Sequence, residues 1–170
     1  MRLIYLGLCL LVTAGSSNSL TSPASPTTTG SRLAHTEAHD GTELPFGGSF
    51  TTATEVPPPS AYATAEGMAT HLGRFSATIA AAVNPDGTST GTFTFTAANG
   101  DQLSGTFVGE GVFLPPNTAR ITEVATIQDG TGRLAGATGT FTMVRFDTID
   151  FPTGKATGYG TFEGQINLNK

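Results

Sequence analysis

The sequence predicts an all-β domain, a single antiparallel barrel of seven to eight strands that is closed or nearly closed. Three observations support this prediction. Turn signatures occur at 84–87, 99–101 and 152–154, and the segments between them alternate Thr with Phe, Gly or aliphatic residues. Charged residues make up only 12% of the chain, which argues against a helical bundle. Regular short strands with Gly and Pro turns favour a sandwich or barrel over alternating strands and helices.

Seven strands follow from the chain taken in order. They lie near 44–54, 67–83, 88–98, 102–113, 118–128, 138–149 and 155–168. The second is long enough to bend or split around Gly73, which would give eight strands. The triple proline at 57–59 predicts a stiff extended loop, and the proline pair at 115–116 interrupts the chain between the fourth and fifth strands.

The turn at 84–87, Asn-Pro-Asp-Gly, sets the register of the first clear hairpin. It fits a three-residue loop, a type I turn with Gly87 in the left-handed position. Asn84 then pairs with Thr88, and further along the hairpin Ile79 lies opposite Phe93. Odd-numbered residues therefore face inward, and the threonines at even positions form an outward ladder, a common solvent-facing surface of a sheet.

The turn at 99–101, Asn-Gly-Asp, contains a conflict between local and long-range signals. Asn-Gly alone favours a two-residue type I′ turn, which would place Leu103 and Phe107 on the threonine face. A shift of one residue turns every side chain over, so burial has to decide the register. We therefore expect a three-residue loop here, or a bulge close to it. Leu103 then lies opposite Ala97. Phe107 lies opposite Phe93.

The last hairpin turns at Pro-Thr-Gly, 152–154, and is expected to pair Phe151 with Lys155. Even-numbered residues of the final two strands then face inward, including Val144 and Phe146. The glycines at even positions of the last strand share this inner face, where they let a sheet bend sharply. A closed barrel is therefore favoured over a flat sandwich.

The odd-numbered residues of the last two strands are expected to face solvent in this register. They are Arg145, Asp147, Tyr159 and Glu163. Arg145 and Glu163 would be near-diagonal neighbours and form a surface ion pair, worth at most about 1 kcal/mol.

Residues 1–15 are typical of a signal peptide, 16–40 of a Ser/Thr/Pro-rich disordered linker, and 41–170 of the barrel domain. In the first segment a basic residue precedes an apolar run that is too short for a membrane span, and small residues follow it. We therefore expect an exported protein, extracellular or periplasmic, with no integral membrane span after signal removal. Cys9 follows a poor lipobox, Leu-Gly-Leu, so lipoprotein attachment is disfavoured.

Charge and motif content argue against several kinds of partner. The formal net charge is −5 and no run of Lys and Arg occurs, so a nucleic acid is not expected as a partner. We expect no cofactor and no metal. His35 and His39 have an i, i+4 spacing, but they fall in the linker, where solvation is the simpler interpretation.

Two polar residues are candidates for catalysis. His71 shares parity with Phe75, and Glu123 shares parity with Ile121 and Ile127, so both are expected to point inward. A buried Glu is costly unless it is paired or protonated. A His–Glu pair in an apolar cup could act as an acid–base unit or orient a polar ligand head. Two alternatives stay open, in which His71 caps a loop and Glu123 lies on a solvated face.

Six apolar residues are expected to line a ligand cavity inside the barrel. They are Phe75, Ile79, Phe93, Phe95, Phe107 and Ile127. The interior of an eight-stranded barrel is nearly filled by side chains or holds one small ligand. An open cavity would favour a ligand binder or an enzyme, whereas a cavity plugged by these residues would favour a structural role.

Three segments carry a resemblance to known proteins. GTGRLAGATGTF, 130–141, resembles the glycine-rich turn of dirigent and allene-oxide-cyclase-like barrels. The Asn-Gly-Asp hairpin and the stretch HLGRF, 71–75, resemble exported bacterial proteins of the same barrel type. The resemblance covers roughly 67–166 and implies an eight-stranded, calycin-like barrel with a cavity, whose relatives often form homo-oligomers. It implies guidance of radical coupling or cyclisation of an unsaturated fatty-acid epoxide, although the bacterial relatives largely have no assigned function.

The sequence therefore favours an exported barrel that is a non-catalytic module and binds a small apolar ligand or a partner. The alternative is a cofactor-free enzyme of the cyclase or dirigent kind, an isomerase or coupling guide that acts on an apolar substrate in the cavity around His71 and Glu123. A third interpretation is a structural or assembly role through the threonine-rich outer face or an edge strand.

Overall fold

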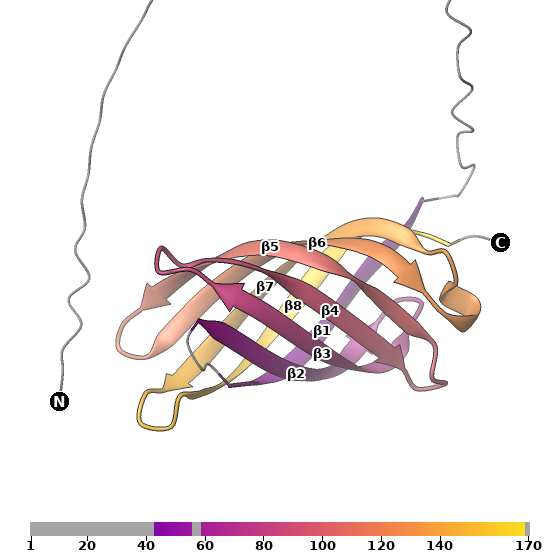
Figure 1. Cartoon of the computed structure of the whole chain (residues 1–170). Helices are drawn as coiled ribbons and strands as arrows, with labels where there is room; N and C mark the ends of the chain where they lie inside the picture. The colour runs from indigo at the N-terminus through magenta and orange to yellow at the C-terminus, as the bar shows by residue number, and fades with distance from the viewer. Residues whose placement is uncertain (1–42, 56–58, 169–170) are drawn as a thin grey trace, which may run out of the picture. The chain divides into compact units, whose positions relative to one another are not determined.

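The structure is a computed structural model that describes residues 43–55 and 59–168. It forms a closed antiparallel barrel of eight strands (Figure 1). The strands are β1 Glu43–Glu55, β2 Ser60–Ala69, β3 Gly73–Val83, β4 Thr88–Ala97, β5 Gln102–Leu114, β6 Thr118–Gly130, β7 Thr138–Asp150 and β8 Lys155–Asn167. The predicted all-β closed barrel is confirmed. The expected signal peptide and linker lie outside the described residues.

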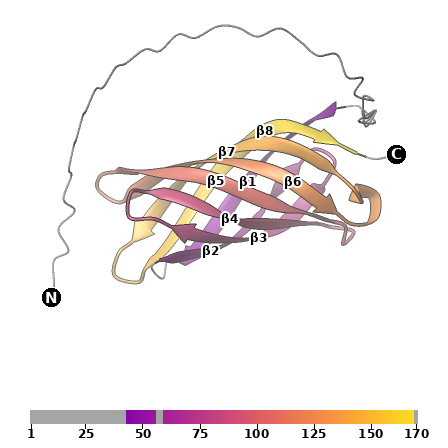
Figure 2. The ribbon, with the colours of Figure 1, turned by 45° about the horizontal axis from the view of Figure 1, so that its top comes forward.

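Each strand pairs with the next along the chain, and β1 pairs with β8 to close the barrel (Figure 2). A short 3₁₀ turn, η1 Gly132–Leu134, lies between β6 and β7 within the glycine-rich segment. In the described part of the chain no helix has the length and hydrophobicity needed to cross a membrane.

The long second strand of the prediction is two strands joined by a tight turn at 70–72. The split therefore occurs just before Gly73, and β2 extends back to Ser60, over residues that the prediction placed in no strand. His71 lies in this turn with a left-handed backbone, φ 63°, and Gly73 follows with φ 68°. The eighth strand thus comes from a turn that carries no Asn-Gly or Pro-Gly signature.

The β3–β4 hairpin has the predicted register. Ile79 lies opposite Phe93, and the Asn84 N–H donates to the Thr88 carbonyl oxygen over 2.8 Å. The Gly87 N–H donates back to the Asn84 carbonyl oxygen, and Gly87 has φ 87°. The even-numbered threonines of β4 face outward as expected.

The β4–β5 hairpin has the predicted faces, but its pairs are shifted by two residues. Leu103 lies opposite Phe95, and Phe107 lies opposite Gly91. The three-residue loop is 98–100 instead of 99–101, with the Ala97 N–H donating to the Asp101 carbonyl oxygen. A shift of two preserves parity, so burial still places both apolar residues inside.

The predicted register of the β7–β8 hairpin is wrong by one residue. Asp150, not Phe151, pairs with Lys155. The Thr153 hydroxyl donates to the Asp150 carboxylate over 2.6 Å, and the Gly154 N–H donates to the Asp150 carbonyl oxygen. These bonds within the turn make a four-residue loop of 151–154, which the Pro-Thr-Gly signature alone did not indicate.

This shift of one residue turns β7 over while β8 keeps its predicted face. Arg145 and Asp147 point into the barrel and are buried, whereas Val144 and Phe146 lie on the outer face. The predicted surface ion pair between Arg145 and Glu163 is therefore wrong, because Glu163 is exposed on the opposite side of the sheet.

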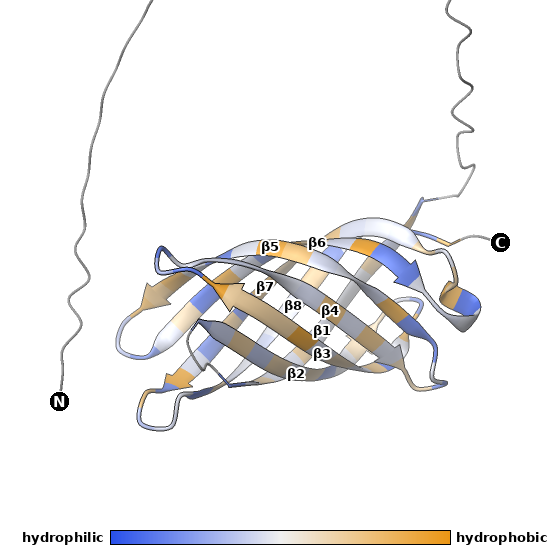
Figure 3. Cartoon of the chain, in the orientation of Figure 1, coloured by the Kyte–Doolittle hydropathy of each residue, from blue (hydrophilic) through white to orange (hydrophobic). Residues whose placement is uncertain are grey.

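Phenylalanine fills one half of the barrel interior. Phe46, Phe95, Phe141 and Phe162 form a mutual cluster, with ring centroids of Phe141 and Phe162 5.1 Å apart. Apolar and polar residues alternate along the strands, as Figure 3 shows by hydropathy. Glycines on neighbouring strands make room for the rings, since a Cβ added at Gly105 would lie 2.9 Å from the Phe93 ring. The rings of this half are buried and pack against one another.

A candidate cavity with a charged floor

A cavity of about 270 Å³ occupies the other half of the barrel. It lies at the end where β3 meets β4, β5 meets β6 and β7 meets β8. Its apolar walls include Ala81, Val83, Phe113, Ile121, Ile149 and Ala156. Phe113 contacts Phe151 of the β7–β8 loop edge-to-face, with centroids 6.0 Å apart, and both rings are exposed. The exposed Phe113 ring therefore lies at the rim of the cavity, and Phe151 packs against it.

Three charged side chains, which we call the charged floor, line this cavity: Glu123, Arg145 and Asp147. All three are buried, with 2%, 6% and 3% of their surface exposed. The Arg145 Nη1 donates to Asp147 Oδ2 over 2.9 Å, and the Thr52 hydroxyl donates to Asp147 Oδ1 over 3.1 Å. Arg145 Nε lies 3.6 Å from Glu123 Oε2, too far for a hydrogen bond.

Cross-strand glycines make room for the charged floor. Glu123 lies opposite Gly109, and Arg145 and Asp147 lie opposite glycines of β8. A Cβ added at Gly109 would lie 2.6 Å from Glu123 Cγ, and one at Gly160 would lie 2.8 Å from Arg145 Cβ. A side chain at these glycine positions would therefore collide with the charged floor.

Two atoms of the charged floor form no hydrogen bond with any described residue. They are the acceptor Glu123 Oε2 and the donor Arg145 Nε. Burial raises the pKa of the Glu123 carboxyl above its ordinary value; the Arg145 guanidinium opposes this shift and Asp147 adds to it. An unsatisfied buried polar group costs about 1–3 kcal/mol. A buried polar group without a partner calls for an explanation, and a ligand that bonds to it would supply one.

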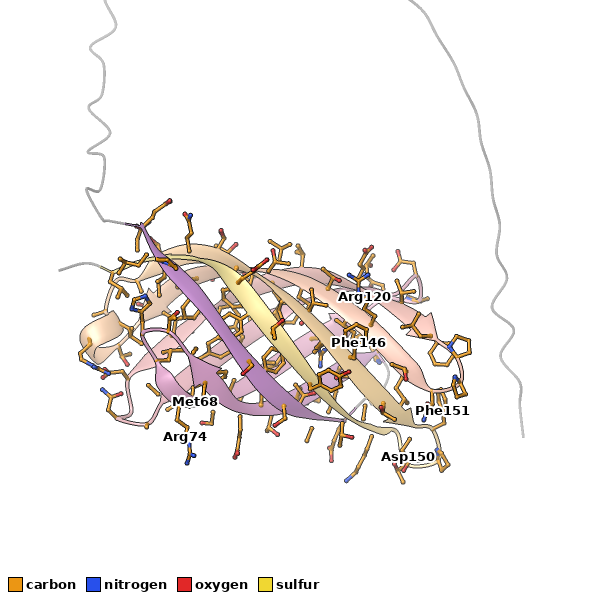
Figure 4. All side chains as sticks on the ribbon, turned by 180° about the vertical axis from the view of Figure 1, so that it is seen from behind. Met68, Arg74, Arg120, Phe146, Asp150 and Phe151 are labelled. Carbon is orange, nitrogen blue, oxygen red and sulfur yellow. The ribbon has the colours of Figure 1, made fainter. Side chains whose placement is uncertain are left out.

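The two predicted catalytic candidates lie at opposite ends of the barrel. Glu123 points inward as its parity predicted and lines the cavity. His71 lies in the β2–β3 turn at the far end; it is exposed and its Nε2 lies 3.0 Å from the Pro45 carbonyl oxygen. Figure 4 shows Met68 and Arg74, which pair next to that turn, toward one end of the barrel and Phe151 at the other end. The expected inward orientation of His71 is therefore wrong, because the tight turn breaks strand parity before residue 73.

The six residues expected to line a cavity all face the interior and are buried. They belong to the packed core cluster, and none of them contributes to the walls of the cavity described here. Two of them, Ile79 and Phe93, also line a separate hollow together with Tyr62 and Lys155. Smaller residues line the cavity at the other end.

Arg145 and Asp147 are site residues that sequence reasoning assigned to the surface. One signal pointed to them, because an inward Glu is costly unless it is paired or protonated, and a buried cation would pair it. Arg145 is on the strand next to Glu123, and the register that turns it inward supplies that charge. Among residues 43–55 and 59–168, no group of three or more His, Cys, Asp or Glu could hold a metal ion. His35 and His39 lie outside those ranges.

The outer face of the barrel carries exposed apolar residues among its threonines. Val108 pairs across strands with Val124, and both are about half exposed. Phe146 stacks on Tyr159 with centroids 6.0 Å apart. Such residues give a partner something to contact, but nothing in the structure shows what covers them.

No protein-family model matches the chain, and neither a curated protein nor a solved structure gives a significant match. The cavity and its charged floor must therefore be interpreted from their own chemistry.

Proposed function

We propose that this protein is a binding module for a small, mostly apolar ligand, held inside the barrel with a polar group on the charged floor. The observation that supports this most is a buried, incompletely hydrogen-bonded Glu–Arg pair that lines an otherwise apolar cavity. Ligand sites are mostly apolar with a few convergent polar groups that fix orientation.

The size of the cavity limits the ligand. A dry cavity of about 150 Å³ accommodates benzene, so 270 Å³ corresponds to a molecule of about ten non-hydrogen atoms. A long-chain fatty-acid derivative would have to extend through the rim past Phe113. This limit favours a compact ligand over the substrate of an allene-oxide-cyclase-like enzyme.

Two measurements test ligand binding. Native mass spectrometry of the protein from its own source should detect a stoichiometric small molecule. For the ligand-free protein, titration with ethylbenzene should move the backbone amide signals of Ala81, Ile121 and Ile149 and leave those around Phe162 unchanged. Signals that stay fixed throughout, in a protein that carries no ligand, would rule out the proposal.

A second candidate function is acid–base catalysis in the same cavity, as in a cofactor-free isomerase. One observation favours it: burial raises the pKa of the Glu123 carboxyl, and a general acid or base works best with a pKa near the working pH. His71 would take no part, since it lies at the far end. Incubation of the bound molecule with the protein and with Glu123→Gln would test this role, because only catalysis converts the ligand.

We also propose that the protein is exported, on the pattern of residues 1–15. Cell fractionation of the full chain against a chain without those residues tests this. Retention of both forms in the cytoplasm would refute it.

A further inference from the structure

We propose that the cavity selects a neutral alcohol, a compact apolar body whose single hydroxyl sits on the Glu123–Arg145 pair, and that it discriminates against carboxylates. This inference rests on the proposed function, that the cavity binds a small ligand. It names the class of ligand, which the shape of the cavity alone does not.

The first argument is the unused hydrogen-bonding capacity of the pair. Arg145 Nε offers a donor and Glu123 Oε2 an acceptor, 3.6 Å apart, and neither is satisfied by a described residue. A hydroxyl carries one donor and two acceptor lone pairs. One oxygen can lie about 2.8 Å from both atoms and satisfy them together. It can do so whether or not Glu123 is protonated, because its proton and lone pairs can exchange roles.

The second argument is charge. The charged floor holds two carboxylates and one guanidinium, and Asp147 already occupies Arg145 Nη1. A ligand carboxylate would bring a third negative charge into a buried site beside Glu123. A ligand ammonium would lie beside the guanidinium and offer no acceptor to Arg145 Nε. A neutral hydroxyl adds no charge to be desolvated.

The third argument is the rest of the lining. Outside the charged floor, its polar side chains are the hydroxyls of Thr54 and Ser89, and Thr54 Oγ1 also has no hydrogen-bond partner among the described residues. The other walls are alanine, glycine and larger apolar residues. Among the described residues that line the cavity, no second cation is present to receive an acidic head group, so the strong polar anchor in this lining is the charged floor.

A matched ligand series tests the inference on the unaltered protein. The probes share a phenylethyl frame of suitable size: 2-phenylethanol, ethylbenzene, phenylacetate and 2-phenylethylamine. Calorimetric or NMR titration at neutral pH gives each dissociation constant. We expect 2-phenylethanol to bind about tenfold more tightly than ethylbenzene, because its hydroxyl bonds to charged partners. Phenylacetate and 2-phenylethylamine should both bind more weakly than the alcohol.

The variant Glu123→Gln sharpens the test. The amide keeps the shape of the side chain but removes the charge, so the preference for the alcohol over ethylbenzene should fall to about threefold or less. Glu163→Gln, at an exposed position on the outer face of β8, is the matched control and should keep the full preference.

The outcomes separate the two proposals. If no probe binds, the proposed ligand-binding function fails. If ethylbenzene binds and the alcohol gains nothing, or if phenylacetate or the amine binds best, the proposed function stands and the alcohol inference is overturned. A preference that Glu123→Gln leaves intact would also overturn it, because the hydroxyl would then sit elsewhere.

Discussion

The two halves of the barrel share the same eight strands and the same alternation, but they are filled in opposite ways. At the end near the β2–β3 turn, phenylalanine rings occupy the interior and contact one another. At the other end, alanines and short aliphatic residues line a cavity, and three buried charges form its floor. The first half is a packed apolar core, whereas the second half contains buried polar atoms that lack hydrogen-bond partners among the described residues.

Glycine makes both arrangements possible. In the packed half, Gly91 and Gly105 lie against the rings of Phe107 and Phe93. In the cavity half, the glycines lie against Glu123, Arg145 and Asp147 instead. We therefore expect substitutions in the two halves to affect different measurements: stability in the packed half and, under the proposed function, ligand binding in the cavity half.

The largest expected effect on stability is in the packed half. Phe141→Ala should lower the free energy of unfolding by about 4 kcal/mol, because it opens a void among rings that already fill the interior. Urea denaturation measures this change. Thr140→Ala, its exposed neighbour, is the control and should cost less than about 1 kcal/mol. If the folded variant kept the same ethylbenzene affinity, the separation of the two halves would be supported; a large loss of affinity would contradict it.

In the cavity half, Arg145→Met should lower the free energy of unfolding by about 3 kcal/mol, because it leaves two buried carboxylates without a cation. Arg120→Met, on the exposed face of β6, is the control with the same chemical change. An Arg145→Met protein as stable as the parent would mean that the charged floor is not held together by Arg145.

A smaller effect is expected in the pH dependence of stability. Because the folded-state pKa of Glu123 is raised above its ordinary value of 4.5, the folded protein keeps a proton that the unfolded chain has lost. That contribution to stability is fully present below the unfolded pKa and is lost as the pH rises through the folded pKa. Glu123→Gln should remove this decline. Denaturation midpoints from pH 4 upward measure it, and an unchanged slope in the variant would refute the assignment.

The smallest expected change in stability accompanies a complete loss of binding. Ala81→Leu fills part of the cavity and should alter the free energy of unfolding by less than about 1.5 kcal/mol. Ethylbenzene should no longer bind. Ala82→Leu, the next residue on β3, points outward and is exposed, so it should leave the affinity as it was. Binding that survives in Ala81→Leu would place the ligand elsewhere.

The fold was predictable where a turn carries its own signature. Asn-Pro-Asp-Gly places Gly87 correctly, and the register of β3 and β4 follows from it. The register of β7 and β8 was not predictable in this way, because Asp150 makes hydrogen bonds within the turn that lengthen the loop by one residue. Because of this shift of one residue, the prediction placed Arg145 and Asp147 on the outer face. An inward Glu123 favours a buried cation on a neighbouring strand. A comparison of registers across strands would have shown that Arg145 supplies one.

The pairing of β1 with β8 has a consequence for the order of folding. The hairpins between consecutive strands can form as soon as each strand is available, whereas the seam joins the first strand to the last. Pairing two strands so far apart in the sequence has a larger loop-closure entropy cost than pairing consecutive strands. Until β8 arrives, β1 and β7 each present an unpaired edge on which other chains can add. The short-lived open sheet, rather than the finished barrel, is therefore the state in which this protein is most prone to aggregate.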